Sequence, residues 1–76
     1  PDISIVDPPR AGLHPKALKN ILNLNQKKII YISCNPSTQA RDLKEIVNYG
    51  YKIKNIIPVD MFPHTPHIES IVTLVK

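Results

Sequence analysis

Residues 28–36 read KIIYISCNP, and this stretch joins the pattern of a buried strand to that of a helix start. The run from Ile29 to Ile32 is apolar without polar alternation, which is typical of a strand covered on both faces in a parallel sheet. Asn35 is a favourable N-cap, and Pro36 suits the first helical turn. The stretch therefore predicts an α/β protein in which a strand ends at Cys34 and a helix follows directly.

The flanking segments extend this alternation of strands and helices. The β-branched residues 3–6 stop at a Pro-Pro pair, which removes two backbone donors and so ends a strand. Residues 15–23 have apolar positions at helical spacing, and Gly50 is placed to end the helix that starts at Pro36. The chain therefore reads as strands 3–6, 28–34, 51–59 and 68–75, with helices at 15–23 and 36–49.

The connections predict how these strands run. A helix between two strands requires that they be parallel neighbours, whereas the short link of residues 60–67 favours an antiparallel last pair. Pro58 indicates that strand 51–59 lies near an edge or finishes early. We therefore expect the order β-α-β-α-β-β with the last strand antiparallel.

Composition narrows the possible functions. A single cysteine cannot form an intramolecular disulfide, and two glycines 38 positions apart cannot form a G-x-G-x-x-G phosphate loop. The net charge of +4 is compatible with a polyanionic partner without proving one. The longest apolar run is far shorter than the ~20 residues that cross a bilayer, and no secretion leader opens the chain. We expect a soluble, cytoplasmic protein with no membrane contact.

Three chemically capable side chains are expected at one edge of the sheet. In open parallel sheets, ligands bind outside the carboxyl ends of the strands. Asp7 and Cys34 lie at two such ends, and Glu69 opens the last strand, which starts at the same edge. Each also has a simpler interpretation: Asp7 as a loop cap, Cys34 as a small buried hydrophobe, and Glu69 as an exposed carboxylate paired with Arg10 or a lysine.

The types of these side chains suggest nucleophilic and acid–base chemistry. Cys34 lies between a strand end and a helix start, where the helix dipole favours a thiolate nucleophile. Glu69 begins an apolar strand, and a carboxylate in that place is suited to act as a general base. The one cysteine together with His14, His64 and His67 lacks zinc-ligand spacing, so no metal site is expected.

Three blocks of the sequence together resemble one family. They are segment 7–12 (DPPRAG), segment 33–38 with 40–42 (SCNPST and ARD), and segment 60–65 with 67–69 (DMFPHT and HIE). In collinear order they closely resemble the C-terminal catalytic region of the RNA 5-methyluridine methyltransferases. That family transfers a methyl group from S-adenosylmethionine to C5 of a uridine in transfer or ribosomal RNA. The resemblance covers nearly the whole chain.

The resemblance implies a role for each candidate residue. Cys34 would be the nucleophile that adds to uracil C6, which makes C5 nucleophilic enough to take the methyl group. Glu69 would then remove the C5 proton and so expel the thiolate. Asp7 would belong to the pocket for S-adenosylmethionine and substrate. The candidate substrate-binding residues are Arg10, His64 and His67.

The same resemblance implies that residues 1–76 are part of a larger catalytic domain. The family has an earlier half-sheet whose glycine-rich turn and acidic residue hold the cofactor, and no such turn occurs here. The chain would then be the C-terminal half of a Rossmann-like class I methyltransferase sheet, inactive alone. Its partner would be ribosomal or transfer RNA, and of the two we favour ribosomal RNA. Its first strand, residues 3–6, would be an exposed edge through which the chain self-associates.

Two other functions stay open. A 5-methylcytosine nucleic-acid methyltransferase also uses a cysteine at C6, although its thiol typically follows Pro or Thr and it lacks the His-x-Glu of residues 67–69. A non-catalytic basic α/β binding module would instead have Cys34 buried and inert.

Overall fold

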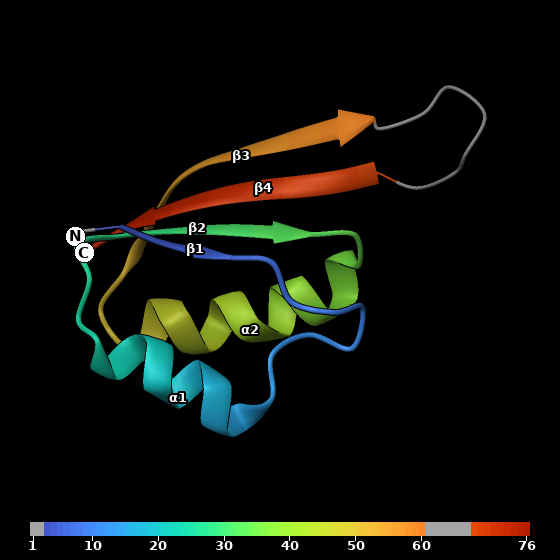
Figure 1. Cartoon of the computed structure of the whole chain (residues 1–76). Coiled ribbons are helices and arrows are strands. Elements are labelled where there is room, and N and C mark those ends of the chain that lie inside the picture. The colour runs from blue at the N-terminus through green and yellow to red at the C-terminus, as the bar shows by residue number, and fades with distance from the viewer. Residues whose placement is uncertain (1–2, 61–67) are drawn as a thin grey trace.

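The computed structural model describes residues 3–60 and 68–76, which form four strands and two helices (Figure 1). The elements are β1 (Ile3–Val6), α1 (Pro15–Asn23), β2 (Lys28–Ser33), α2 (Pro36–Asn48), β3 (Lys52–Asp60) and β4 (Ile68–Val75). They follow one another in the order expected from the sequence. Neither helix in these ranges is long and apolar enough to cross a membrane.

The four strands form one mixed sheet in the order β1-β2-β4-β3. β1 and β2 are parallel, and β4 is antiparallel to both β2 and β3. The α/β class and the antiparallel last strand are therefore confirmed. The expectation that β2 and β3 are neighbours is wrong, because β4 lies between them. The crossover through α2 makes β3 run parallel to β2 but leaves room for one strand between them. β4 runs back in the opposite direction and occupies that place.

Both helices pack on the same face of the sheet (Figure 1). The chain moves in one direction across the sheet from β1 to β2 to β3, so two crossovers of the same hand place their helices on one side. The buried apolar core lies between the helices and the sheet. Its members are Val6, Leu18, Leu22, Ile29, Tyr31, Ile46, Tyr51, Val72 and Leu74.

Burial alternates along β2, although its sequence is apolar throughout. Tyr31 is fully buried beneath the helices, whereas Ile30 and Ile32 on the other face are only half-buried. On the neighbouring β1, Ile5 is paired with Ile30 and is 70% exposed. The prediction that β2 is covered on both faces is therefore wrong for the described residues, in which the helices cover one face only.

The local signals at the element ends are confirmed. The Asn35 side chain accepts a hydrogen bond from the Ser37 N–H over 3.1 Å, which caps α2, and Pro36 occupies the first turn. α2 ends at Asn48 with Tyr49 as its C-cap, and Gly50 comes next with a φ of 123°, a conformation that glycine adopts without strain. β3 includes Pro58 and lies at an edge of the sheet, one of the two outcomes that this proline indicated.

Candidate active site at one edge of the sheet

Cys34 lies in the turn between β2 and α2, and its free thiol is half-buried. Ser33 tightens this turn, because its hydroxyl accepts from the Asn35 N–H over 3.0 Å and donates to the Asn35 carbonyl over 3.1 Å. The thiol therefore lies on a backbone fixed at both sides, at the carboxyl end of a central strand and outside the apolar core.

Glu69 is the second residue of β4 and is half-buried. The pairing of β4 with β2 places Ser70 opposite Ser33. Antiparallel partners advance in opposite directions, so extending this register by one residue places Glu69 across from Cys34. The structure thus brings the predicted nucleophile and the predicted base to adjacent strand ends.

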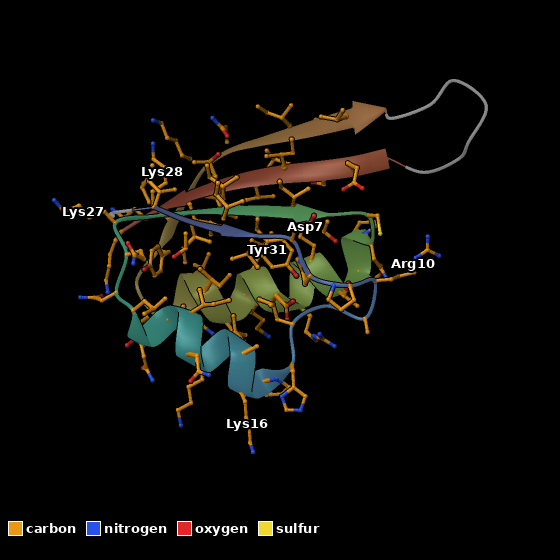
Figure 2. All side chains as sticks on the ribbon, viewed as in Figure 1. Asp7, Arg10, Lys16, Lys27, Lys28 and Tyr31 are labelled. Atoms are coloured by element: carbon orange, nitrogen blue, oxygen red, sulfur yellow. The ribbon has the colours of Figure 1, made fainter. Side chains whose placement is uncertain are left out.

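Asp7 follows directly after β1 and is exposed. Because β1 and β2 are parallel neighbours, Asp7 and Cys34 lie at the same edge of the sheet. Figure 2 shows Asp7 and Arg10 toward this end of the molecule, and Lys27 at the opposite end. The predicted convergence of three strand ends is therefore present in the described structure.

His64 and His67 lie outside the described residues, so their contacts with substrate stay predictions. The remaining histidine, His14, is the N-cap of α1, where its Nδ1 accepts from the Lys16 N–H over 3.1 Å. Within residues 3–60 and 68–76, no three His, Cys, Asp or Glu side chains are grouped as a metal site would require.

The loop after β1 is held against α2 by side chains of the helix. The Arg10 carbonyl oxygen accepts from Asn35 Nδ2 and from Thr38 Oγ1, each over 3.0 Å. The Ala11 carbonyl oxygen accepts from Arg41 Nη2 over 3.1 Å. The loop that includes Asp7 and the helix that follows Cys34 are therefore joined directly. These contacts were not foreseen from the sequence.

Asp42 is the buried carboxylate of this region, with 2% of its surface exposed. Its Oδ2 accepts from the Leu13 N–H over 2.8 Å and from the Tyr31 hydroxyl over 2.5 Å. Burial, followed by the hydrogen bond to Asp42, raises the pKa of Tyr31 well above its usual range, which keeps this hydroxyl protonated. An acidic residue three positions after Gln39 and four before Ile46, on the buried stripe of α2, is the sequence signal that could have revealed it.

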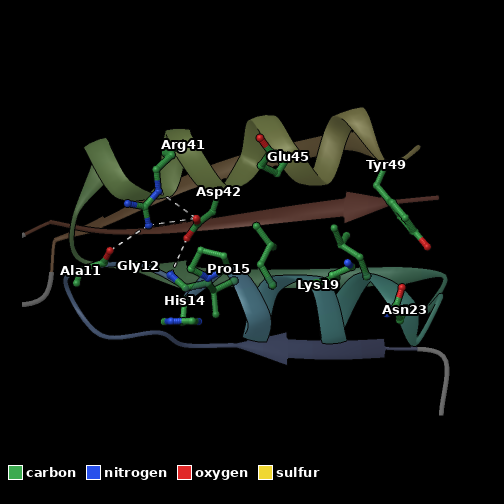
Figure 3. Close-up of a pocket in the computed structure, with 13 residues that line it drawn as sticks. Ala11, Gly12, His14, Pro15, Lys19, Asn23, Arg41, Asp42, Glu45 and Tyr49 are labelled. Atoms are coloured by element: carbon green, nitrogen blue, oxygen red, sulfur yellow. Dashed lines mark hydrogen bonds and ion pairs between the residues drawn. The ribbon is translucent and has the colours of Figure 1, made fainter.

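A groove of about 800 Å³ lies between α1 and α2 (Figure 3). Its rim includes Lys19 and Glu45, one from each helix, and Asp42 lies at one end. None of the candidate catalytic or substrate-binding residues within the described part of the chain lines this groove. The groove is therefore separate from the edge where the strand ends converge.

Proteins similar in sequence to this chain are RNA methyltransferases. The family model described as tRNA (uracil-5-)-methyltransferase matches residues 2–76. The chain is 54% identical over 76 residues to an RNA methyltransferase of Caldanaerobacter subterraneus, covering all of this chain and 17% of that protein. It is also 54% identical over 74 residues to one of Bacteroides thetaiotaomicron, covering 97% of this chain and 16% of the relative.

The fold matches a solved structure of the same kind. The crystal structure of Pyrococcus abyssi tRNA (uracil-54, C5)-methyltransferase in complex with S-adenosyl-L-homocysteine aligns with a TM-score of 0.84 and 51% identity, over 97% of this chain and 18% of that chain. Sequence and fold thus match one part of known RNA methyltransferases. The chain belongs to the tRNA (uracil-5-)-methyltransferase family, which confirms the resemblance of the three blocks. It spans 16–17% of the length of the curated relatives named above.

Proposed function

We propose that this chain supplies the nucleophile and the base of an enzyme that methylates uridine C5 in RNA with S-adenosylmethionine. The observation that supports this most is the pairing of Ser33 with Ser70, whose neighbours in the chain are Cys34 and Glu69. The end of β1 at Asp7 lies at the same edge. A thiolate and a carboxylate that both reach one bound base are what the addition and elimination steps need.

The proposed reaction begins with the Cys34 thiolate. Its attack forms a bond to uracil C6 and pushes the electron pair of the C5–C6 double bond into an enolate, whose negative charge is shared with C5. Bound S-adenosylmethionine would supply an electrophilic methyl group to that carbon and leave as S-adenosylhomocysteine, which keeps the electron pair of the broken methyl–sulfur bond. Glu69 then takes the C5 proton, the C5–C6 double bond reforms, and the Cys34–C6 bond breaks to return the thiolate. Each electron pair is accounted for, and the methyl group replaces one proton.

The cofactor would meet only part of its site in this chain. Asp7 is an exposed carboxylate at the carboxyl end of β1, and the half-buried Pro8 behind it restricts the backbone. Such an acceptor can receive hydrogen bonds from a nucleoside or an amino group. One carboxylate and no glycine-rich turn are too few contacts for a whole cofactor. We infer that the chain alone binds S-adenosylmethionine weakly and is inactive.

The proposed substrate is a uridine in ribosomal or transfer RNA in the cytoplasm. The sequence resemblance led us to favour ribosomal RNA, whereas the matching family description and the P. abyssi protein both concern transfer RNA. The proposal therefore includes both. Arg10 is exposed at the candidate edge, where its guanidinium could bind an RNA phosphate. His64 and His67 complete the proposed substrate contacts.

The test uses a chimera in which this chain replaces the matching 18% of the P. abyssi methyltransferase. RNA containing 5-fluorouridine should form a covalent complex with the chimera, because fluorine at C5 cannot leave as a proton and the Cys34 bond is trapped. Cys34→Ala should form none. On ordinary RNA, Glu69→Gln should accumulate methylated covalent complex, because elimination fails after addition and transfer.

Glu45→Gln is the matched control, since Glu45 is an exposed carboxylate of α2 that lines the groove and not the candidate edge. It should behave like the parent chimera. A covalent complex that persists in Cys34→Ala would reject the nucleophile. If the complex forms with 5-fluorocytidine RNA and not with 5-fluorouridine RNA, the protein is a 5-methylcytosine enzyme instead.

A further inference from the structure

We propose that Asn35 and Thr38 are positioning residues that fix the loop after β1 relative to the Cys34 thiol. The inference rests on the proposed function, since it concerns the alignment of the same reaction. Its basis is one carbonyl oxygen, that of Arg10, on which two side chains of the α2 start converge.

The two hydrogen bonds use the full accepting capacity of that oxygen. Asn35 Nδ2 and Thr38 Oγ1 each lie 3.0 Å from the Arg10 oxygen, and a carbonyl oxygen has two lone pairs. Thr38 Oγ1 also lies 3.3 Å from the Asn35 carbonyl oxygen, so the Arg10 oxygen is the nearer of two acceptors for its one proton. The Arg10 carbonyl is thus held by two side chains from the start of α2.

Asn35 connects this contact to the nucleophile. It is covalently bonded to Cys34, its Oδ1 caps α2 through the Ser37 N–H, and its Nδ2 binds the loop. With the oxygen committed to the cap, the amide nitrogen is directed outward to Arg10. One side chain therefore sets both the start of the helix and the distance from the loop to the thiol.

A second set of contacts holds the loop further along. Arg41 binds the Ala11 carbonyl, and the buried Asp42 binds the Leu13 N–H. The loop also closes on itself through a 2.8 Å bond from the Gly12 N–H to the Pro9 carbonyl. These bonds remain when Thr38 is changed. The loss of its hydroxyl should therefore release the Arg10 end of the loop without detaching the loop from the helix.

A small shift at this place should affect the reaction step more than RNA binding. Misplacement of reacting groups by about 1 Å can lower rates by about 10²-fold. RNA affinity, in contrast, comes from many phosphate contacts spread over the surface. We expect kcat to fall about tenfold in Thr38→Val while KM for RNA changes less than about twofold, since only part of the alignment is lost.

The experiment measures kcat, KM and the melting temperature of the chimera and of four variants. Thr38→Val removes the hydroxyl at nearly the same volume, and Thr38→Ser restores it and should recover the parent kcat. Asn35→Ser keeps an oxygen for the helix cap, removes the Nδ2 donor and adds no charge beside the thiol, and it should lower kcat as Thr38→Val does. Ser37→Ala is the control from the same turn, because its hydroxyl makes none of these bonds.

A drop in kcat for Thr38→Val and Asn35→Ser, at unchanged melting temperature and with recovery in Thr38→Ser, supports the positioning role. Parent kcat in both variants overturns it. If Thr38→Val lowers the melting temperature, the kcat of Asn35→Ser decides between these two outcomes. The variant Cys34→Ala, measured alongside, separates the two proposals: full activity there rejects the proposed function, whereas its loss together with parent-like Thr38→Val rejects only the positioning role.

Discussion

Tyr31 donates its hydroxyl to the Asp42 carboxylate over 2.5 Å, and the two residues are 0% and 2% exposed. This bond joins the centre of β2 to the middle of α2, and the same carboxylate oxygen accepts from the Leu13 N–H of the loop. One buried carboxylate therefore connects strand, helix and loop. A buried acceptor with good partners stabilises the fold only while those partners are present.

Removing either member of this pair should destabilise the fold by different amounts. Tyr31→Phe loses one hydrogen bond to a charged group and should lower the free energy of unfolding by about 1.5–3 kcal/mol. Asp42→Ala should cost about 3 kcal/mol or more, because it leaves the buried Tyr31 hydroxyl and the half-buried Leu13 N–H without an acceptor. Urea unfolding measures both.

The control for Tyr31→Phe is Tyr49→Phe, since Tyr49 is 46% exposed. Its contact with Lys76 is made by the aromatic ring, which phenylalanine keeps. It should change the unfolding free energy by less than about 0.5 kcal/mol. Equal losses in the two variants would contradict the assigned importance of the buried bond.

The stability should also depend on pH in the alkaline range. The pKa of Tyr31 is raised by burial and then by its bond to Asp42, and that of Tyr51 is raised by burial. An unfolded tyrosine ionises near pH 10. Above about pH 10 the unfolded chain therefore binds fewer protons than the folded one, and the free energy of unfolding falls as pH rises.

Unfolding curves should be measured from about pH 8 to about pH 11, a range that spans the usual tyrosine pKa of about 10. They should show this decline in the free energy of unfolding, and the decline should be shallower in Tyr31→Phe. Part of the pH dependence should remain in this variant, because Tyr51 is still present with its raised pKa. A decline that is as steep in Tyr31→Phe as in the parent would show that Tyr31 is not its source.

Gly12 should be far less tolerant of alanine than Gly50. Both have positive φ, 85° and 123°. A Cβ at Gly12 would lie 2.6 Å from Arg41 Nη2 and 3.0 Å from both Asp42 Oδ2 and Thr38 Cβ, whereas a Cβ at Gly50 meets nothing within 4 Å. Gly50→Ala should cost about 1–2 kcal/mol through backbone strain alone.

Gly12→Ala should lower the free energy of unfolding by more, about 3 kcal/mol. Besides the backbone strain, the new Cβ should push the loop away from α2. In the chimera it should also lower kcat, since the Arg10 contacts are on the same loop. The measurements are unfolding free energy and kcat of both variants. Equal effects at the two glycines would mean that the loop has room to move away from the helix.

Local signals explain why much of the fold could be predicted. Asn35 with Pro36, and Gly50 after the helix, act on backbone atoms within a few residues, so their meaning does not depend on distant parts of the chain. The positions of Asp7 and Cys34 at one edge follow from the parallel strands, which the helical crossover requires. The candidate site was predictable for the same reason.

The features that were missed depend on contacts between distant segments. The crossover through α2 and the return of β4 are both compatible with β4 on either side of β3, and only packing decides. Ile30 and Ile32 are apolar whether or not another layer covers them, so the run could not show that the helices cover one face. The contact of Asp42 with Leu13 joins residues 29 positions apart.

The β1 edge of the sheet leaves backbone groups open to a second copy of the chain. β1 is an edge strand, and Ile3 and Ile5 on it are 48% and 70% exposed. Unpaired backbone groups and apolar side chains on one strand favour pairing with a second copy of the chain. The chain alone should therefore form dimers or larger species at high concentration, as measured by sedimentation.

Ile5→Lys should weaken that association, because a charge on the edge strand is costly to bury between two copies. Ile57→Lys is the matched comparison, since Ile57 is 50% exposed on β3 at the opposite edge of the sheet. If the copies pair through β1, only Ile5→Lys should shift sedimentation toward the monomer. Equal shifts in both variants would instead indicate contact through the uncovered face of the sheet, which the two isoleucines share. A parent chain that stays monomeric at millimolar concentration would show that neither surface mediates self-association.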